Sequence, residues 1–145
     1  MIQHENRYIR QIAMPEIGEQ GQERLRQSRV LVVEAGGLGS PLLYYLAAAG
    51  VGNIAIADYD VVDESNLNRQ ILHSVKDIGV PKVDSARNTL ESLNPNIKID
   101  SRNVRVSAKN LFSISRDADL VLDAVDSFGA KFSLQRKRFL PLMHR

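Results

Sequence analysis

Three closely spaced glycines have the residue type and spacing to bind a phosphate group. Gly36, Gly37 and Gly39 directly follow a short apolar run at 30–33, and a second apolar stretch runs on to residue 49. Glycine lets backbone N–H groups approach a ligand closely, and the start of a helix favours negative charge. A tight turn without any ligand explains the same glycines, so the interpretation needs support from other residues.

Two carboxylates supply that support. Asp58 and Asp60 follow the next apolar run, at 54–57. The separation of Asp58 from Gly36 is close to the offset of about 20 residues at which a carboxylate commonly holds a ribose hydroxyl. The glycines, the helix after them and Asp58 together favour a nucleotide site.

The elements that must position these residues alternate between strands and helices. The β-branched run at 30–33 is typical of a strand buried on both faces of a parallel sheet. Pro41 and Gly50 mark the start and stop of the next helix, and the run at 54–57 completes a βαβ unit. Further strands are expected at 97–99 and 120–122, helices at 5–12, 21–27, 81–93 and 111–114, and a short helix at 66–73.

A third pair of carboxylates, Asp123 and Asp126, follows the last predicted strand. In an open parallel sheet, ligands bind beyond the carboxyl ends of the strands, where these residues join the glycines and Asp58. The sequence therefore predicts an α/β fold: a Rossmann-like, doubly wound, mostly parallel sheet with two flanking N-terminal helices. Four strands are few for such a fold, which indicates a truncated domain.

Composition and charge exclude several classes of protein. The 145 residues contain no cysteine, which removes disulfides, thiolate zinc sites and a cysteine nucleophile. No apolar run approaches the roughly 18 residues of a membrane span and no leader is evident, so we expect no membrane association and a cytoplasmic location. The net charge of +2 comes from the basic segment 127–145, while the preceding residues are net acidic. No nucleic-acid surface is therefore expected.

Several motifs, in order along the chain, resemble those of the ThiF/MoeB/HesA family, the prokaryotic relatives of ubiquitin-activating enzymes. The most specific is Ser-Asn-Leu-Asn-Arg-Gln at 65–70, which follows Asp-Tyr-Asp at 58–60. The others are Arg-Tyr-Ile-Arg-Gln at 7–11, Ala-Gly-Gly-Leu-Gly-Ser at 35–40, Ala-Ala-Gly-Val-Gly at 48–52 and Asp-Ile-Gly-Val-Pro-Lys at 77–82. The resemblance runs from about Arg7 to Asp126, and the chain is identified as a member of this family.

The resemblance implies adenylation of a ubiquitin-like sulfur-carrier protein. Such proteins bind ATP and Mg²⁺, and the C-terminal carboxylate of the carrier attacks the α-phosphorus to give an acyl-adenylate and pyrophosphate. By this match Asp58 holds the ribose, Asn66, Arg69 and Lys82 contact the phosphates, Asp126 holds the metal, and Arg10 reaches the ATP of a partner subunit in a homodimer. Gly36, Gly37, Gly39 and Asp60 complete the expected nucleotide site, and Arg10, Arg69, Lys82 and Asp126 are the expected catalytic residues.

The chemistry of this step needs cations more than a protein nucleophile. Joining a carboxylate to a polyanion brings like charges together, so positive groups must neutralise the charge that develops on phosphorus. Arg69 suits this role through its planar fork and Lys82 as a point charge. Without the resemblance, the same residues would be a solvated arginine and a surface lysine, and Asp126 would be a helix cap. The three histidines share no metal-ligand spacing and are interpreted as structural: His4, His73 and His144.

Glu34 departs from the family pattern because it stands where the first glycine of the turn is expected. A side chain there is expected to crowd the nucleotide, and a carboxylate would face phosphates. Like charges about 4 Å apart repel by about 1 to 4 kcal/mol, depending on the effective dielectric, so affinity should fall roughly ten- to a thousandfold. We therefore expect weak or no adenylation, and a gain in ATP affinity when Glu34 is replaced by glycine.

The end of the chain departs as well. Ser127 replaces the usual asparagine, and family members continue through further strands that carry the carrier-docking surface and, in many members, a zinc-binding cysteine pair. We expect a nucleotide-binding domain at 1–134, a basic tail of unclear origin at 135–145, and no zinc site. The alternative to an adenylyltransferase is a non-catalytic dimer, or a fragment that needs a partner chain. An NAD-dependent dehydrogenase is disfavoured because a chain of this length lacks room for a substrate domain.

Overall fold

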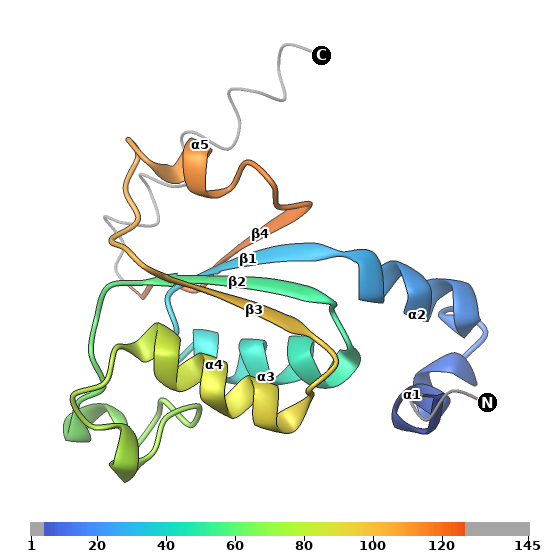
Figure 1. Ribbon diagram of the computed structural model, residues 1–145, viewed down its shortest axis with the longest axis horizontal. Helices are drawn as coiled ribbons and strands as arrows, with labels where there is room; N and C mark the ends of the chain where they lie inside the picture. The colour runs from blue at the N-terminus through green and yellow to red at the C-terminus, as the bar shows by residue number, and fades with distance from the viewer. Residues whose placement is uncertain (1–4, 127–145) are drawn as a thin grey trace.

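A parallel sheet of four strands organises the chain. The computed structural model describes residues 5–126, and its strands are β1 (Arg29–Val33), β2 (Asn53–Asp58), β3 (Lys98–Asn103) and β4 (Leu120–Asp123). All neighbours are parallel and lie in the order β3-β2-β1-β4 (Figure 1). The order reverses at β1, because the chain builds outward through β2 and β3 before it crosses back to β4. The predicted doubly wound α/β sheet is confirmed.

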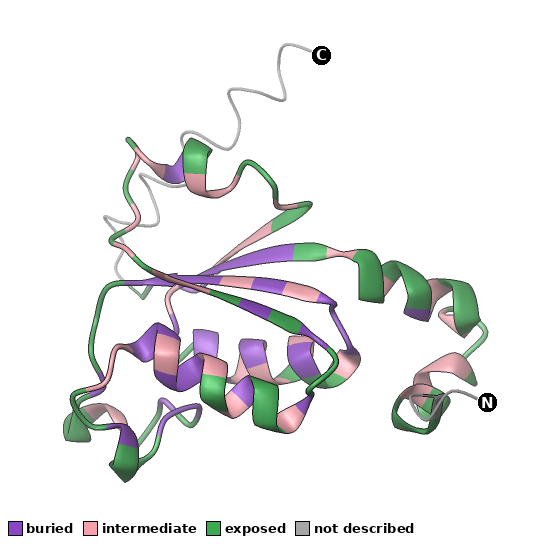
Figure 2. Ribbon diagram, viewed as in Figure 1, coloured by how far each residue is buried: buried purple, intermediate pink, exposed green. Residues whose placement is uncertain are grey.

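Two helices, α3 (Gly39–Ala49) and α4 (Lys82–Leu93), cover one face of the sheet (Figure 1). The main core lies between them and the strands, and includes Val32, Leu43, Ile54 and Leu90, each at most 1% exposed. The other face has a lighter cover from the segment around α5 (Leu111–Ile114), where Figure 2 shows many exposed and half-buried residues. The sheet therefore has one fully buried face and one thinly covered face.

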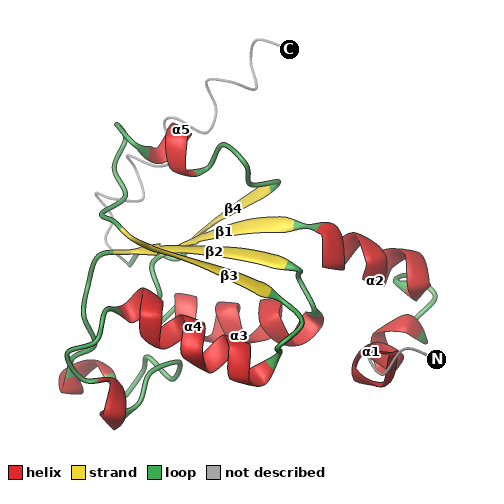
Figure 3. Cartoon of the chain, in the orientation of Figure 1, coloured by secondary structure: helices red, strands yellow, loops and turns green. Residues whose placement is uncertain are grey.

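The N-terminal helices α1 (Glu5–Ile12) and α2 (Gly18–Gln27) flank the sheet at the end where its strands begin (Figure 3). Hydrogen bonds tie them to the end of α3, since the side chains of Gln11 and Gln22 both donate to the carbonyl of Ala49 at 3.0 Å. Gly50 ends α3 with a left-handed φ of 84°, and a Cβ there would lie 2.6 Å from Tyr8. Close packing and backbone conformation both require glycine at this position.

The segment between β2 and α4 differs from the prediction. In place of a short helix at 66–73, the chain forms 3₁₀ turns at Glu64–Asn66 and Val75–Asp77, joined by irregular turns. Asp63 and Ser74 start these turns by local side-chain hydrogen bonds, which compete with the α-helix. The predicted helix after Pro81 is confirmed, with Pro81 directly before its first residue.

Candidate functional site

A cavity of about 1060 Å³ opens at the carboxyl ends of β1, β2 and β4, where the strand order reverses. This is the edge at which ligands bind in doubly wound sheets. The cavity brings together most of the residues that the sequence predicted for the site: Gly36, Gly37, Asp58, Asp60, Asn66, Arg69, Lys82 and Asp126. Gly39 and Arg10 lie outside its lining.

The turn formed by residues 34–39, here called the glycine turn, presents backbone donors to this cavity. Within residues 5–126, the N–H groups of Gly36, Gly37 and Leu38 donate to no other residue. No side chain caps the start of α3, so nothing on the helix competes for these donors. The turn therefore has the unpaired N–H groups that an anion needs.

Gly39 has a packing role that the sequence did not predict. A Cβ at this position would lie 2.1 Å from the carbonyl oxygen of Glu34, a separation that no side chain can occupy. The glycine lets α3 start directly against the turn, and this contact determines where the N–H groups of Gly36 and Gly37 lie. Gly39 shapes the site without lining it.

Asp58 connects the end of β2 to the glycine turn. Its carboxylate accepts hydrogen bonds from the N–H of Ala35 at 2.8 Å and from the N–H of Asp60 at 2.9 Å. The residue is 3% exposed, yet it lines the cavity. An ionised carboxylate has about four lone-pair sites, so two backbone bonds leave capacity for a hydroxyl donor of a ligand.

Two contacts with Asp60 hold Lys82 at the cavity. Its ammonium lies 3.1 Å from the carboxylate of Asp60, and its backbone N–H donates to the carbonyl of the same residue at 2.9 Å. The lysine side chain is only 7% exposed, while that of Asp60 is 48% exposed. A buried ammonium with one exposed partner keeps further donors for an anionic ligand.

Arg69 supplies a second cation from the irregular segment after β2. Its guanidinium donates to the side chain of Asn68 at 3.0 Å and to the carbonyl of Ser65 at 3.3 Å. Its aliphatic stem lies beside Gly37, where a Cβ would come within 3.7 Å of the arginine. The guanidinium is thus next to the glycine turn, from which it can reach the same anion as the backbone donors.

Sequence reasoning missed several residues of the lining. The guanidinium of Arg105 lies 4.8 Å from the centroid of the Tyr59 ring, in a cation–π contact between the ends of β2 and β3. Gln70 is 5% exposed, and its side-chain oxygen has no hydrogen-bond partner among the described residues. Tyr59 and Arg105 were detectable, because each follows a strand. The position of Gln70 depends on an irregular turn that local patterns do not specify.

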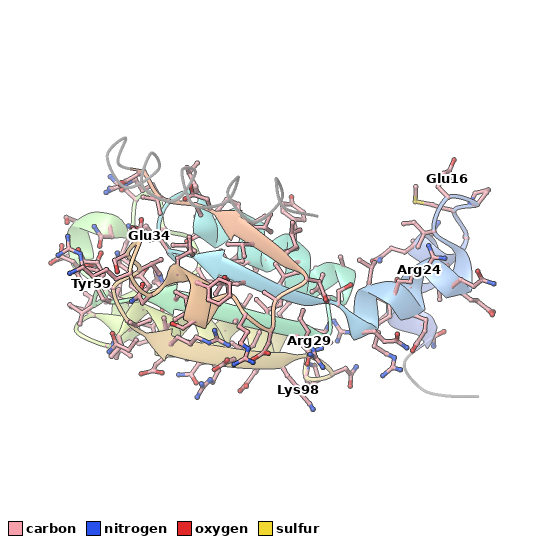
Figure 4. All side chains as sticks on the ribbon, turned by 90° about the horizontal axis from the view of Figure 1, so that it is seen from above. Glu16, Arg24, Arg29, Glu34, Tyr59 and Lys98 are labelled. Atoms are coloured by element: carbon pink, nitrogen blue, oxygen red, sulfur yellow. The ribbon has the colours of Figure 1, made fainter. Side chains whose placement is uncertain are left out.

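Glu34 carries the one left-handed backbone conformation found among the described non-glycine residues, with φ at 71°. Burial raises the pKa of its carboxyl from 4.5 to about 7, as do the negative charges of Asp58, Asp126 and Asp60, against the opposing effect of Lys82. Figure 4 places Glu34 at the same end of the sheet as Tyr59. The side chain lines the cavity, as expected for a residue that replaces the first glycine of the turn.

Arg10 lies on exposed α1, away from the cavity, because α1 is near the end of the sheet where the strands begin (Figure 1). Its assignment to the site of a partner subunit stays a prediction. Ser127, His144 and the basic tail at 135–145 lie outside the described residues, as does His4. His73 is buried and hydrogen-bonded on both ring nitrogens, which agrees with a structural role.

Comparison with known proteins shows the family of the chain. The model of the ThiF family matches residues 8–139. The chain belongs to the ThiF family. This confirms the resemblance drawn from the motifs around the glycine turn, Asp58 and Arg69.

Two similar curated proteins are named as adenylyltransferases. This ThiF-family chain is 48% identical over 126 residues to a probable adenylyltransferase/sulfurtransferase MoeZ of Mycobacterium tuberculosis, covering 87% of this chain and 32% of that protein. It is 45% identical over 127 residues to the sulfur carrier protein adenylyltransferase of Thermus thermophilus, covering 88% and 47%. The chain thus spans 32% and 47% of the length of these two relatives.

A solved structure supports the fold. The E. coli tRNA N6-threonylcarbamoyladenosine dehydratase TcdA, crystallised in complex with ATP, aligns with a TM-score of 0.82 at 27% identity, over 92% of this chain and 56% of that one. Within residues 5–126 of the present chain, no helix is long and apolar enough to cross a membrane.

Proposed function

We propose that this chain supplies the nucleotide-binding region of an adenylyltransferase that activates the C-terminal carboxylate of a ubiquitin-like sulfur carrier. One observation carries the proposal: unpaired N–H groups, a ribose-type carboxylate and two cations converge on one cavity at the reversal point of a ThiF-family sheet. The names of the relatives add the reaction class, since they include a sulfur carrier protein adenylyltransferase.

In this proposal the phosphates of ATP lie against the glycine turn. The N–H groups of Gly36 and Gly37 donate to phosphate oxygens, while Arg69, beside the turn, and Lys82, beside Asp60, neutralise their charge. As the carboxylate of the carrier attacks the α-phosphorus, negative charge spreads over the phosphate oxygens, and the fixed cations stabilise it. Pyrophosphate leaves, and no covalent bond to the protein is needed.

Asp58 would accept hydrogen bonds from the ribose hydroxyls. Its two backbone bonds hold the carboxylate at the junction of β2 and the glycine turn, so the sugar would be oriented before the phosphates react. Asn66, at the end of a 3₁₀ turn that faces the cavity, would contribute a further polar contact to the phosphates.

Asp126 fits the expected Mg²⁺. Its exposed carboxylate lines the cavity just beyond β4, and Mg²⁺ characteristically takes one or two carboxylates together with phosphate oxygens and water. The described residues contain no cluster of three or more His, Asp or Glu side chains that could hold a metal ion. When bound, the ion would add charge neutralisation at the phosphates.

Dimerisation and docking of the carrier are also part of the proposal. A homodimer in which Arg10 reaches a second site, and docking of the carrier, require surfaces beyond this cavity. The alternative is a nucleotide-binding fold without catalysis, and Glu34 is the observation that favours it. Its carboxylate occupies the phosphate side of the cavity and opposes the ligand that the other residues suit.

Titration calorimetry with ATP and Mg²⁺ tests the proposal on the native chain and on Glu34→Gly. We expect weak binding by the native chain and binding tighter by roughly ten- to a thousandfold by the variant, because a repelling charge is removed. Adding Lys82→Ala to Glu34→Gly should weaken binding by roughly 10- to 100-fold, the value of a charge-assisted hydrogen bond.

Lys98→Ala on the Glu34→Gly background is the matched control, because Lys98 is an exposed lysine at the other end of the sheet (Figure 4). It should leave the affinity unchanged. Absence of ATP binding by both the native chain and Glu34→Gly would contradict the proposed function.

A further inference from the structure

His73 lies buried beneath the glycine turn. Its Nε2 is 3.0 Å from the carbonyl oxygen of Ala35, and its Nδ1 is 2.8 Å from the hydroxyl of Ser85 on α4. A carbonyl oxygen only accepts hydrogen bonds, so Nε2 must carry a proton. Burial lowers the pKa of His73, which favours the neutral ring, and its Nδ1 lies against the hydroxyl of Ser85, which also hydrogen-bonds to the carboxylate of Asp77. The tautomer and the orientation of the ring are therefore both determined.

The contact with Ala35 also orients a donor on the other side of the same peptide. The carbonyl of Ala35 and the N–H of Gly36 belong to one trans peptide unit, in which the two groups point in opposite directions. Holding the carbonyl toward buried His73 therefore directs the N–H of Gly36 away from the core. Because Gly36 lines the cavity, this is the direction from which a ligand approaches.

Without this contact, little resists rotation of the peptide. Its neighbour Glu34 is already in a strained left-handed conformation, and Gly36 has no side chain to restrict it. A flipped peptide would present the carbonyl of Ala35 to the phosphates, so a repelling acceptor would replace a donor. The remaining contacts of the turn, from Ala35 N–H to Asp58 and from Ser40 N–H to the carbonyl of Gly36, do not hold this peptide unit.

We propose that His73 is a positioning residue for phosphate binding, which holds the Ala35–Gly36 peptide so that the N–H of Gly36 faces the nucleotide. The proposal rests on the proposed function, since it assigns a ligand to the glycine turn. It gives the buried histidine a role in binding in addition to its role in packing.

The test compares three variants of the contact. In His73→Gln, the side-chain amide nitrogen reaches about the position of Nε2 and keeps a donor for Ala35. His73→Leu removes the donor but keeps an apolar side chain in the core. Ser85→Ala removes the partner of Nδ1 and leaves Nε2 in place. Asn94→Ala is the control, because Asn94 is fully buried and donates to the carbonyl of Ala47 at 2.8 Å, far from the turn.

The first readout uses the free chain and needs no nucleotide. In the native chain, NMR should detect a scalar coupling across the hydrogen bond from Nε2 of His73 to the carbonyl carbon of Ala35. The Gly36 amide resonance should stay near its native position in His73→Gln and move in His73→Leu. Absence of the coupling, or an unmoved Gly36 resonance in a folded His73→Leu, would overturn the inference.

The second readout is ATP·Mg²⁺ affinity on the Glu34→Gly background. We expect His73→Leu to weaken binding about tenfold or more, His73→Gln to restore most of it, and Ser85→Ala to have an intermediate effect. Asn94→Ala should lower the melting temperature without this loss. Equal affinities for His73→Leu and Asn94→Ala would leave His73 a purely structural residue and overturn the inference.

The two proposals fail in different ways. If Glu34→Gly itself does not bind ATP, the proposed function fails, and the phosphate-positioning role fails with it even where the NMR contact is present. If Glu34→Gly binds but His73→Leu on that background binds equally well, the proposed function stands and only the role of His73 is overturned.

Discussion

Two parts of the cavity, the β2 wall (Asp58, Asp60 and Lys82) and the β1 wall (Glu34), differ in how their carboxylates are accommodated. On the β2 wall, Asp58 is satisfied by two backbone donors and Asp60 is paired with the ammonium of Lys82. On the β1 wall, Glu34 is strained at φ 71° and its carboxyl has its pKa raised to about 7. Under the proposed function, Glu34 is the side chain of this cavity that opposes the nucleotide.

The largest expected effect comes from breaking the β2 wall. Asp58→Ala leaves the N–H groups of Ala35 and Asp60 buried or half-buried without their acceptor. Each such loss costs roughly 1–3 kcal/mol, so we expect the free energy of unfolding to fall by roughly 2–6 kcal/mol, and ATP binding to be lost. Urea denaturation measures the first and calorimetry the second. A variant as stable as the native chain would contradict the assigned role of Asp58.

Two substitutions of Glu34 separate the backbone strain at this residue from its charge, and their difference in stability is expected to be smaller. Glu34→Ala removes the carboxylate but keeps a side chain in the left-handed region, whereas Glu34→Gly removes both. We expect the glycine variant to be more stable than the alanine variant by about 1 kcal/mol, the usual cost of a left-handed residue with a Cβ. Equal midpoints and slopes in urea would show that the backbone at Glu34 is unstrained.

The pH dependence of stability tests the environment of the Glu34 carboxyl. Because burial and the neighbouring carboxylates raise the pKa of Glu34 from 4.5 to about 7, the folded chain binds this proton more tightly than the unfolded chain does. The free energy of unfolding should therefore fall as pH rises through that window, relative to Glu34→Gln, and the difference should level off above it. Denaturation curves of both chains in matched buffers provide the measurement. A difference that grows with rising pH would have the wrong sign.

The smallest effect is expected at the opposite end of the molecule. Arg10 lies on exposed α1 and lines no part of the cavity within its own chain. Arg10→Ala should leave stability and ATP affinity of the isolated protomer unchanged, and alter only a function that needs two subunits. A clear loss of ATP binding by a monomeric Arg10→Ala chain would refute the assignment of this arginine to a partner subunit's site.

Much of the fold followed from the sequence because its signals are local. The β-branched run at 30–33, the Pro41 and Gly50 boundaries and the strand at 54–57 each depend on a few neighbouring residues, and all were confirmed. The carboxyl ends of parallel strands meet at one edge of the sheet, so the sequence also predicted that the glycine turn, Asp58 and Asp126 lie together. All three line the same cavity.

The remaining features depend on contacts between distant parts of the chain. The contact of His73 with Ala35 joins residues 38 positions apart, through a segment that was predicted as a helix and forms irregular turns. The role of Gly39 became visible only from its approach to the carbonyl of Glu34. Sequence indicated that Glu34 was unusual but not its backbone conformation, because φ at one residue is determined by the turn as a whole.

In the proposed function, the charge of Glu34 opposes a nucleotide in a cavity whose other residues suit one. The most direct test is the affinity for ATP·Mg²⁺ of the native chain and of Glu34→Gln, measured side by side from about pH 6 to about pH 8.5. Protonation of ATP itself affects both chains equally, so the ratio of the two affinities isolates Glu34. We expect the affinity of the native chain to fall progressively below that of Glu34→Gln as pH rises through about 7. A ratio that stays constant across this range would contradict this expectation.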